Sequence, residues 1–199
     1  MNEKAREETK HCHHRGNGRA PSSYWMHDPE LAFNALRIHP GETVLDLGCG
    51  AGDYSLRAAR LVGDSGRVHA MDAQAPFVAS LSRKAKEENL QSLVVTRQDI
   101  TQPLPVGARS VDLCLLSTVL HGVGLRPRGE AVFREIHRVL KPGGRLAVIE
   151  CQKRDTECGP PKHMRLAPEE VEACAVPCGF AAERLVDLGF NYLLLFRRN

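Results

Sequence analysis

The nine residues "VLDLGCGAG" (Val44–Gly52) place a short apolar run directly before three glycines at alternate positions. Glycine allows positive φ angles and lets the backbone approach a ligand without a Cβ in the way. The run, the turn and the helix-like segment that follows, Asp53–Val62, predict a strand, a tight turn and a helix N-terminus. Open α/β sheets bind ligands at that end of a strand. The turn is therefore predicted to face a small molecule, with a tight turn that binds nothing as the alternative.

The segments after this turn alternate between strand-like and helix-like patterns. The strand-like runs are Thr43–Leu47, Arg67–Met71, Leu93–Thr96, Val111–Leu116, Arg145–Ile149, Ala182–Leu188 and Tyr192–Arg197. The helix-like segments are 53–62, 76–89, 128–140 and "APEEVEACAVPCGF". This alternation predicts a doubly wound α/β fold, in which helices cover both faces of a mostly parallel sheet. The last two runs are joined by "GFN" as a hairpin, so the last strand is expected to be antiparallel.

Length and composition limit the class of protein. The 199 residues, 42% hydrophobic and 26% charged, predict one globular domain. The net charge of +3 comes without a long basic stripe, which argues against a nucleic-acid partner. Residues 1–23 are polar and predict a flexible tail before a domain at 24–199. No apolar run is long enough for a membrane span or a signal peptide, which favours a cytoplasmic protein.

Acidic residues end the next two strand-like runs. Asp72 closes "RVHAMD", 20 residues beyond Gly52, where a carboxylate can accept hydrogen bonds from both hydroxyls of a ribose. Asp99 closes "VVTRQD", where it can accept from the amino group of adenine. Each acid alone is equally compatible with a solvated strand end. Together with Asp46 of the glycine turn, they predict one cleft for an adenosine-containing ligand.

In combination, these motifs resemble the class I S-adenosylmethionine-dependent methyltransferases, in their type-11-like small-molecule group. "VLDLGCGAG" resembles the first motif, "VHAMD" the second-strand acid, "RQDITQPLPVGARSVDLCLLSTVLHGV" the third and fourth strands, and "FREIHRVLKPGGRLAVIE" the fifth strand with its preceding helix. The resemblance runs from about Tyr24 to the C-terminus. It implies a three-layer, Rossmann-like methyltransferase fold with seven strands in the order 3-2-1-4-5-7-6 and an antiparallel last strand. It also implies in-line methyl transfer to a small molecule, with S-adenosylhomocysteine as product and no metal required.

The resemblance further implies which residues bind the cofactor S-adenosylmethionine. Asp46 would help to place its ammonium group, Asp72 would take the ribose hydroxyls, and Asp99 would meet adenine. Ser117, after the fourth strand, would lie near the methionine end. The full set of implied cofactor-binding positions is Asp46, Gly48, Gly50, Gly52, Asp72, Ala73, Asp99, Ile100 and Ser117.

Four residues are candidates for contact with the methyl acceptor. A general base helps only if the acceptor must lose a proton. His121, in "STVLHGV", suits that role because histidine titrates near neutral pH, although it could instead pack or cap a helix. Glu150 ends the fifth strand on the same sheet edge and is a candidate catalytic or substrate-contacting residue. His163 and Arg165, in "PPKHMRL", are candidates for lining the acceptor pocket.

The N-terminal segment 24–40 is predicted to form a helix that can also act as a lid. Asp28 suits the N-cap and Pro29 the first helical position. Tyr24 and Trp25, just before this helix, could exclude water and touch the acceptor. Packing of both rings on the core is the alternative.

Other functions stay open at this point. A nicotinamide dehydrogenase shares the strand, the glycine turn and the distal acid, but its G-x-G-x-x-G pattern would need glycine where this chain has Asp53. Methylation of a macromolecule and cofactor binding without methyl transfer are also compatible with the motifs. The oligomeric state cannot be derived from the sequence.

The cysteines raise a further alternative, an arsenite-type methyltransferase that holds its metalloid on thiols. Cys151 and Cys158 bracket a polar loop and suit this reading best. Cys174 and Cys178 share a helix face with apolar residues and are predicted to be core residues. No C-x-x-C pair is present, so no structural metal site is predicted. The "HCHH" run at 11–14 is expected to be a solvated part of the tail.

Overall fold

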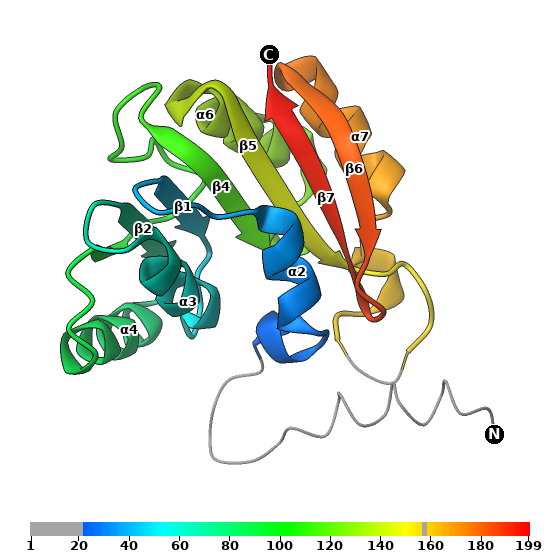
Figure 1. The fold of residues 1–199 in the computed structure, drawn as a ribbon. Helices are drawn as coiled ribbons and strands as arrows, with labels where there is room; N and C mark the ends of the chain where they lie inside the picture. The colour runs from blue at the N-terminus through cyan, green and yellow to red at the C-terminus, as the bar shows by residue number, and fades with distance from the viewer. Residues whose placement is uncertain (1–21, 157–158) are drawn as a thin grey trace.

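The computed structural model describes residues 22–156 and 159–199, in which helices cover both faces of a central sheet (Figure 1). The strands are β1 (Thr43–Leu47), β2 (Arg67–Asp72), β3 (Leu93–Arg97), β4 (Val111–Ser117), β5 (Leu140–Cys151), β6 (Phe180–Asp187) and β7 (Asn191–Arg198). The main helices are α2 (Pro29–Leu36), α3 (Asp53–Val62), α4 (Ala75–Glu87), α5 (Leu120–Val123), α6 (Glu130–Val139) and α7 (Pro168–Ala175). Short helical turns are η1 (Ser23–Trp25), η2 (Leu125–Gly129), η3 (Lys162–Met164) and η4 (Val176–Cys178).

The seven strands lie in the order β3-β2-β1-β4-β5-β7-β6. Strand β1 is parallel to both of its neighbours, β2 and β4, whereas β7 is antiparallel to both β5 and β6. The predicted fold class, strand order and antiparallel last strand are confirmed. After β3 the chain crosses β2 and β1 to form β4, so the strand order reverses between the neighbouring strands β1 and β4. Sheets of this kind bind ligands at such a switch point.

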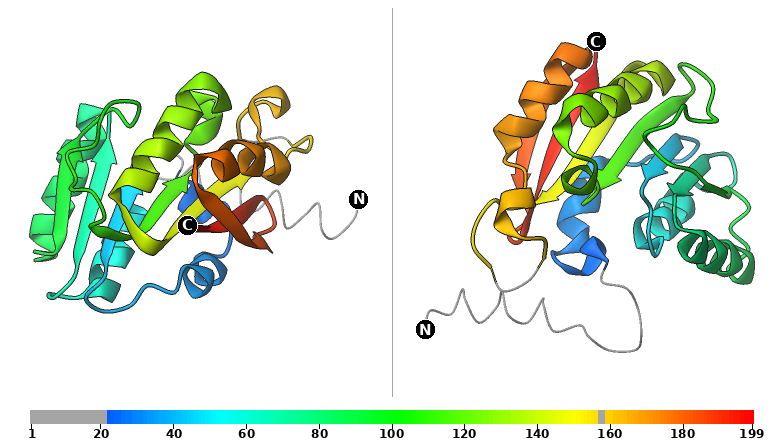
Figure 2. Two further views of the ribbon diagram at one scale, coloured as in Figure 1. Left: turned by 90° about the horizontal axis from the view of Figure 1, so that it is seen from above. Right: turned by 180° about the vertical axis from the view of Figure 1, so that it is seen from behind.

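Two layers of helices bury the two faces of the sheet (Figure 2). Helices α2, α3 and α4 pack on one face, and α5, α6 and α7 pack on the other. Alternate residues of a central strand therefore enter different hydrophobic clusters: in β5, Leu146 and Val148 face α6, whereas Ala147 and Ile149 face the opposite layer. A strand buried on both faces has no polar side, which explains the nearly continuous apolar runs.

Two boundaries in the structure differ from those expected from the sequence. The fifth strand begins at Leu140 rather than at Arg145, because Leu140 already pairs with Val111 of β4, before an irregularity in the register that precedes the pair of Leu113 and Arg145. At the N-terminus, Ser22 and Ser23 belong to the fold rather than to the tail predicted for 1–23, since Ser23 Oγ lies 2.8 Å from Ser117 Oγ of β4. Such a partner, 94 positions away, leaves no local sequence signal. The rest of the predicted tail, residues 1–21 with "HCHH", lies outside the described residues.

The predicted start of the first long helix is confirmed. Asp28 Oδ1 accepts a hydrogen bond from Glu30 N at 2.9 Å, and Pro29 is the first helical residue. This N-cap separates α2 from the turn η1, so the predicted N-terminal helix consists of two pieces. Within 22–156 and 159–199, no helix has the length and apolar character needed to span a membrane.

Candidate functional site

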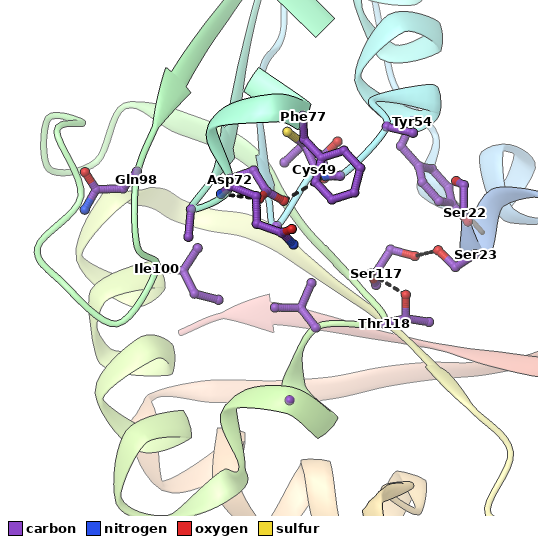
Figure 3. Close-up of a pocket in the computed structure, with 18 of the residues that line it drawn as sticks. Ser22, Ser23, Cys49, Tyr54, Asp72, Phe77, Gln98, Ile100, Ser117 and Thr118 are labelled. Atoms are coloured by element: carbon purple, nitrogen blue, oxygen red, sulfur yellow. Dashed lines mark hydrogen bonds between the residues drawn. The ribbon is translucent and has the colours of Figure 1, made fainter. Parts of the chain in front are cut away.

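A cavity of about 530 Å³ lies at the carboxyl ends of β1, β2 and β4 (Figure 3). This is the switch point of the sheet, and the volume is typical of small-molecule sites, roughly 300–1,000 Å³. Of the cofactor-binding positions predicted from the sequence, the structure brings Asp46, Gly48, Gly50, Asp72, Ala73, Asp99, Ile100 and Ser117 to the cavity wall. Gly52 is the exception, since it lies outside the wall, beneath Leu81 of α4.

The glycine turn is held against β2 by backbone hydrogen bonds and by Asp72. The N–H groups of Gly48 and Cys49 donate to Met71 O at 2.8 and 3.0 Å. Asp72 Oδ2 accepts from Gly50 N at 2.9 Å, and its Oδ1 accepts from Gln74 N at 2.8 Å. Asp72 is only 7% exposed. One carboxylate therefore fixes the turns after both β1 and β2 and also borders the cavity.

Asp46 is a buried acid at the base of the same turn. Its side chain is buried, and Ser55 Oγ donates to its Oδ2 at 2.5 Å. Burial raises the pKa of Asp46 to about 6; the Ser55 hydrogen bond opposes this rise, and the nearby charge of Asp72 adds to it. The ionised carboxylate is therefore costly by itself, and a cation in the cavity would stabilise it.

Asp99, the third predicted acid, occupies a different environment at the exposed rim of the cavity. Its Oδ1 accepts from Thr101 N at 2.9 Å and from Thr101 Oγ1 at 2.8 Å. These two hydrogen bonds lower the pKa of Asp99. Its proposed contact with adenine stays a prediction, and the structure shows that the carboxylate already shapes the loop after β3.

Hydroxyl groups gather at the other end of the cavity from Gln98 and Ile100 (Figure 3). Ser22 and Ser23 come from the N-terminal segment, Tyr54 from the first turn of α3, and Ser117 from the end of β4. Sequence reasoning missed Ser22, Ser23 and Tyr54. For Tyr54 a signal existed, because the second residue of a helix that follows a glycine turn lies close to whatever the turn faces. For the two serines no such signal existed.

The candidate catalytic residues His121 and Glu150 meet each other rather than the cavity. His121 Nδ1 lies 2.9 Å from Glu150 Oε2, and His121 N donates to Glu150 Oε1 at 3.3 Å. Glu150 is 1% exposed, and by accepting from His121 N it contacts the backbone of α5. Neither residue lines the cavity, although their neighbours Thr118 and Gly122 do.

The remaining substrate and lid candidates also lie away from the cavity wall. Arg165 is buried, and its guanidinium donates to the carbonyls of Pro160, Gln152 and Arg154. These bonds hold the loop after β5 in place. His163 is exposed on η3.

In the N-terminal segment, the serines rather than the aromatic residues face the cavity. The ring centroid of Tyr24 lies 5.1 Å from that of Tyr54 in an edge-to-face contact, and Trp25 is 46% exposed. Ser22 and Ser23 line the cavity, while Tyr24 and Trp25 do not. The alternative of core packing therefore holds for Tyr24.

Most thiols of the described residues are buried. Cys151, Cys174 and Cys178 are buried, and Cys174 and Cys178 enter the core cluster as predicted. Cys49 lines the cavity, but burial and the charges of the neighbouring acids raise its pKa. Cys158 lies outside the described residues. Within the described part of the chain, no group of three His, Cys, Asp or Glu side chains is placed to hold a metal.

Substitutions of Gly50 and Gly52 in the turn are expected to affect stability and ligand binding differently. A Cβ on Gly50 (φ +51°) would meet nothing within 4 Å, whereas a Cβ on Gly52 (φ +83°) would overlap Leu81. We expect Gly52→Ala to lower the free energy of unfolding by about 3 kcal/mol through strain and overlap. Gly50→Ala should cost only about 1 kcal/mol, from strain, but weaken ligand binding. Urea unfolding and titration with S-adenosylhomocysteine would separate the two; equal stability losses would contradict the prediction.

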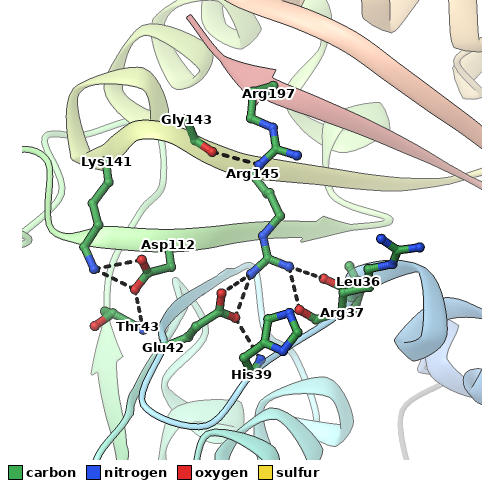
Figure 4. Close-up of polar contacts among 10 residues, drawn as sticks. All are labelled: Leu36, Arg37, His39, Glu42, Thr43, Asp112, Lys141, Gly143, Arg145 and Arg197. Carbon is green, nitrogen blue, oxygen red and sulfur yellow. Dashed lines mark hydrogen bonds and ion pairs between the residues drawn. The ribbon is translucent and has the colours of Figure 1, made fainter.

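A second polar cluster lies at the opposite edge of the sheet and serves the fold (Figure 4). Arg145 donates to both carboxylate oxygens of Glu42, at 2.5 and 2.6 Å, and to the carbonyls of Leu36 and Arg37 at the end of α2. Lys141 bonds Asp112 close by. These charges satisfy one another, so the cluster joins α2 to β5 and is not a second ligand site.

Arg145→Ala is expected to lower the free energy of unfolding by about 2 kcal/mol, because it leaves Glu42 and two helix-end carbonyls without their charged donor. Arg197→Ala is the matched control, since its partner Glu183 and Arg197 itself are both well exposed, at 39% and 44%. Exposed pairs contribute roughly 0–1 kcal/mol. Urea denaturation of both variants tests this, and equal losses would mean that the Arg145 contacts add nothing beyond a surface pair.

The family model, the sequence relatives and a solved structure that resemble this chain are all methyltransferases. A profile of the methyltransferase domain matches residues 38–187. The demethylmenaquinone methyltransferase of Lactobacillus johnsonii is 34% identical over 120 residues, which are 59% of this chain and 47% of that protein. The arsenite methyltransferase of Halobacterium salinarum is 35% identical over 144 residues, which are 72% of this chain and 34% of that protein.

Among solved structures, the crystal structure of an S-adenosylmethionine-dependent methyltransferase from Aquifex aeolicus is similar over nearly the whole fold. The TM-score is 0.81 at 27% sequence identity, and the match covers 90% of this chain and 94% of that one. The sequence relatives are longer: this chain spans about half of the Lactobacillus protein and a third of the Halobacterium protein.

Proposed function

The chain belongs to the methyltransferase-domain family, and we propose that it transfers a methyl group from S-adenosylmethionine to a small-molecule acceptor. The observation that carries this proposal is the cavity at the switch point, where a glycine turn, the buried Asp46 and the doubly bonded Asp72 meet. The likeness to the Aquifex methyltransferase supports it.

The residues of the cavity fit the proposed methyl donor. A buried carboxylate with a raised pKa, Asp46, suits a cationic ammonium group. Asp72 has two oxygens on the cavity border, each with a second lone pair that can accept from a ribose hydroxyl. Gly50 leaves open space where any other residue would place a side chain. Asp99 and Ile100 lie at the end that would take adenine.

Methyl transfer of this kind does not require the protein to form a covalent bond with either reactant. When bound, S-adenosylmethionine supplies a methyl group that its sulfonium has already activated. The residues of the chain then bind, align and exclude water, and good alignment of two reactants can lower a barrier by up to about 7–11 kcal/mol. Ser22 and Ser23 of the N-terminal segment line the hydroxyl-rich end of the cavity, and this end would receive the acceptor.

For the acceptor, we propose a small molecule with a hydroxylated ring, such as a reduced quinone. The Lactobacillus relative is named for methylation of demethylmenaquinone, which motivates this choice. Arsenite is the second candidate, motivated by the Halobacterium relative, but the buried thiols of the described residues do not favour it. The cytoplasmic location, the lack of a metal requirement and the lack of a nucleic-acid partner stay predictions.

The test is a binding titration followed by an acceptor screen. We expect S-adenosylhomocysteine to bind and NADH not to bind; the reverse would favour the dehydrogenase alternative. The protein would then be incubated with S-adenosylmethionine and, separately, 1,4-naphthohydroquinone, arsenite with glutathione, and bulk RNA or protein. Mass spectrometry of S-adenosylhomocysteine reports turnover. Turnover with the hydroquinone supports the proposal; binding with turnover only on a macromolecule would contradict it.

A further inference from the structure

A row of buried polar side chains leads from the cavity into the protein, and the proposed function leaves it unexplained. Tyr54 Oη lies 2.8 Å from His27 Nε2, and His27 Nδ1 lies 3.0 Å from Asn191 Oδ1. Asn191 Nδ2 in turn donates to Cys151 Sγ at 3.5 Å. The four side chains are between 0% and 5% exposed. Polar groups this deeply buried are costly unless they are paired, so the row holds a defined arrangement.

The donor and acceptor in each hydrogen bond of this row can be assigned, starting from Asn191. Because the amide nitrogen of Asn191 donates to Cys151, its oxygen faces His27 and can only accept. His27 Nδ1 must therefore carry the proton, which leaves Nε2 of the neutral imidazole as an acceptor. Tyr54 then donates its hydroxyl proton to His27 Nε2. A lone pair of the Tyr54 oxygen stays available on the side of the cavity.

Tyr54 occupies the hydroxyl-lined end of the cavity, away from Gln98 and Ile100 (Figure 3). Ser117 lines the same end of the cavity, and its hydroxyl contacts that of Ser23. Burial raises the pKa of Tyr54, and the charge of Asp46 adds to this rise. Tyr54 therefore does not ionise in advance. It can take a proton from the acceptor only if it passes its own hydroxyl proton on at the same time.

We propose that Tyr54 is a catalytic residue that takes a proton from the methyl acceptor while it passes its own proton to His27, and that Asn191 positions His27 for this transfer. The inference rests on the proposed function and narrows its substrate class. It selects acceptors whose reacting group loses a proton on methylation, such as a ring hydroxyl. His121 is the weaker candidate for this role, because it bonds Glu150 and does not line the cavity.

The step balances in atoms and charge. The bond between the acceptor atom and the methyl carbon forms, and the bond from that carbon to the sulfonium sulfur breaks with its electron pair left on sulfur. The acceptor proton moves to Tyr54 Oη, and the original Tyr54 proton moves to His27 Nε2. The positive charge thus passes from sulfur to His27, and release of a proton to solvent restores the neutral imidazole.

The first test needs no acceptor. We would label histidine with ¹⁵N in the full chain and record the His27 ring nitrogens at pH 8, with and without S-adenosylhomocysteine. We expect a protonated Nδ1 and an unprotonated Nε2, and we expect Tyr54→Phe to move the Nε2 resonance downfield because its hydrogen bond is lost. A protonated Nε2 would overturn the proposal, because Tyr54 could not then pass its proton to His27.

The second test uses 1,4-naphthohydroquinone, or whichever screened acceptor the wild-type protein methylates. We expect Tyr54→Phe and His27→Gln each to lower kcat by about 100-fold, a typical contribution of a general base. Glutamine can hydrogen-bond Tyr54 and Asn191 but cannot take up the proton, so it separates proton transfer from packing. The affinity for S-adenosylhomocysteine should stay within about 3-fold of wild type, since a fold-level effect would lower both.

Matched controls come from the same residue types outside the cavity. Tyr192→Phe removes a buried hydroxyl that bonds Leu166 O, and His39→Gln changes an exposed histidine; both should keep wild-type kcat. Unchanged kcat in Tyr54→Phe or His27→Gln would overturn this inference while leaving the proposed function intact. Absence of turnover in the wild-type protein would instead contradict the proposed function, and the NMR result would still decide the direction of the hydrogen bonds.

Discussion

The Asp46→Asn variant is expected to unfold at a higher temperature than the wild-type protein at pH 8, and to bind S-adenosylhomocysteine about 100-fold more weakly. Burial raises the pKa of Asp46 from 3.8 to about 6, which corresponds to about 3 kcal/mol of destabilisation when the carboxylate is ionised. Asparagine keeps an acceptor for Ser55 Oγ and carries no charge. We expect a net gain of about 1–2 kcal/mol, because its buried amide N–H offsets part of the benefit.

The pH dependence of this effect has a definite sign. The folded protein binds the Asp46 proton more readily than the unfolded chain does, so the penalty is fully present above about pH 6. It fades as the pH falls through 6 towards 3.8, and the stability difference between variant and wild type should close over that range. Ligand affinity should behave in the opposite way, since protonation below pH 6 removes the charge that attracts an ammonium group.

Thermal unfolding at pH 8 and pH 4.5, with titration calorimetry at pH 8, would measure both effects. Asp64→Asn is the control, because Asp64 is exposed and lies on the loop before β2. A variant less stable than wild type at pH 8 would contradict the assignment of Asp46 as a strained, ligand-directed acid. Unchanged affinity would show that another group meets the ammonium end.

Asp72→Asn is expected to cost both stability and binding. An amide offers one oxygen in place of two, so the N–H of either Gly50 or Gln74 would face an NH₂ group and lose its acceptor. Loss of one such buried hydrogen bond should lower the free energy of unfolding by about 2 kcal/mol. Affinity for S-adenosylhomocysteine should fall about 100-fold, because the ribose loses an acceptor and the glycine turn loses its fixed position.

Asp99→Asn provides the comparison for Asp72→Asn. Asp99 is exposed and accepts two hydrogen bonds from the single residue Thr101, so its replacement should change affinity by no more than about 5-fold. Calorimetric titration of both variants, with urea unfolding of each, measures the contrast. Similar affinity losses for the two variants would contradict the unequal roles that the structure gives them.

Much of the fold follows from local sequence patterns. The apolar runs, the glycine turn and the helix caps are short-range features, and they predict each of the seven strands near its observed position. The strand order comes from the family resemblance and is confirmed. Where prediction fails, at Ser22, Ser23 and the start of β5, the cause is pairing with residues distant in sequence, which no local pattern encodes.

The residues of the candidate site also separate into those that local sequence patterns locate and those that depend on tertiary packing. Strand-end acids can be located from sequence, because parallel strands bring their carboxyl ends to one edge, and Asp46, Asp72 and Asp99 meet there. Which of two glycines borders a cavity, and which only makes room for Leu81, depends on the packing of α4. The chemistry of His121 and Arg165 makes them candidates, but tertiary partners, Glu150 and a set of carbonyls, occupy them instead.

The sequence by itself determined that this chain forms a doubly wound sheet with a glycine turn and acids at successive strand ends, because periodicity and chain order fix those features. Only the tertiary structure decided the state of each acid, the partners of each candidate base, and the row from Tyr54 through His27 to Asn191. Burial and hydrogen-bond direction arise from segments 27 to 164 residues apart. A carboxylate or an imidazole gains its chemical role from those neighbours, and they come together only when the chain folds.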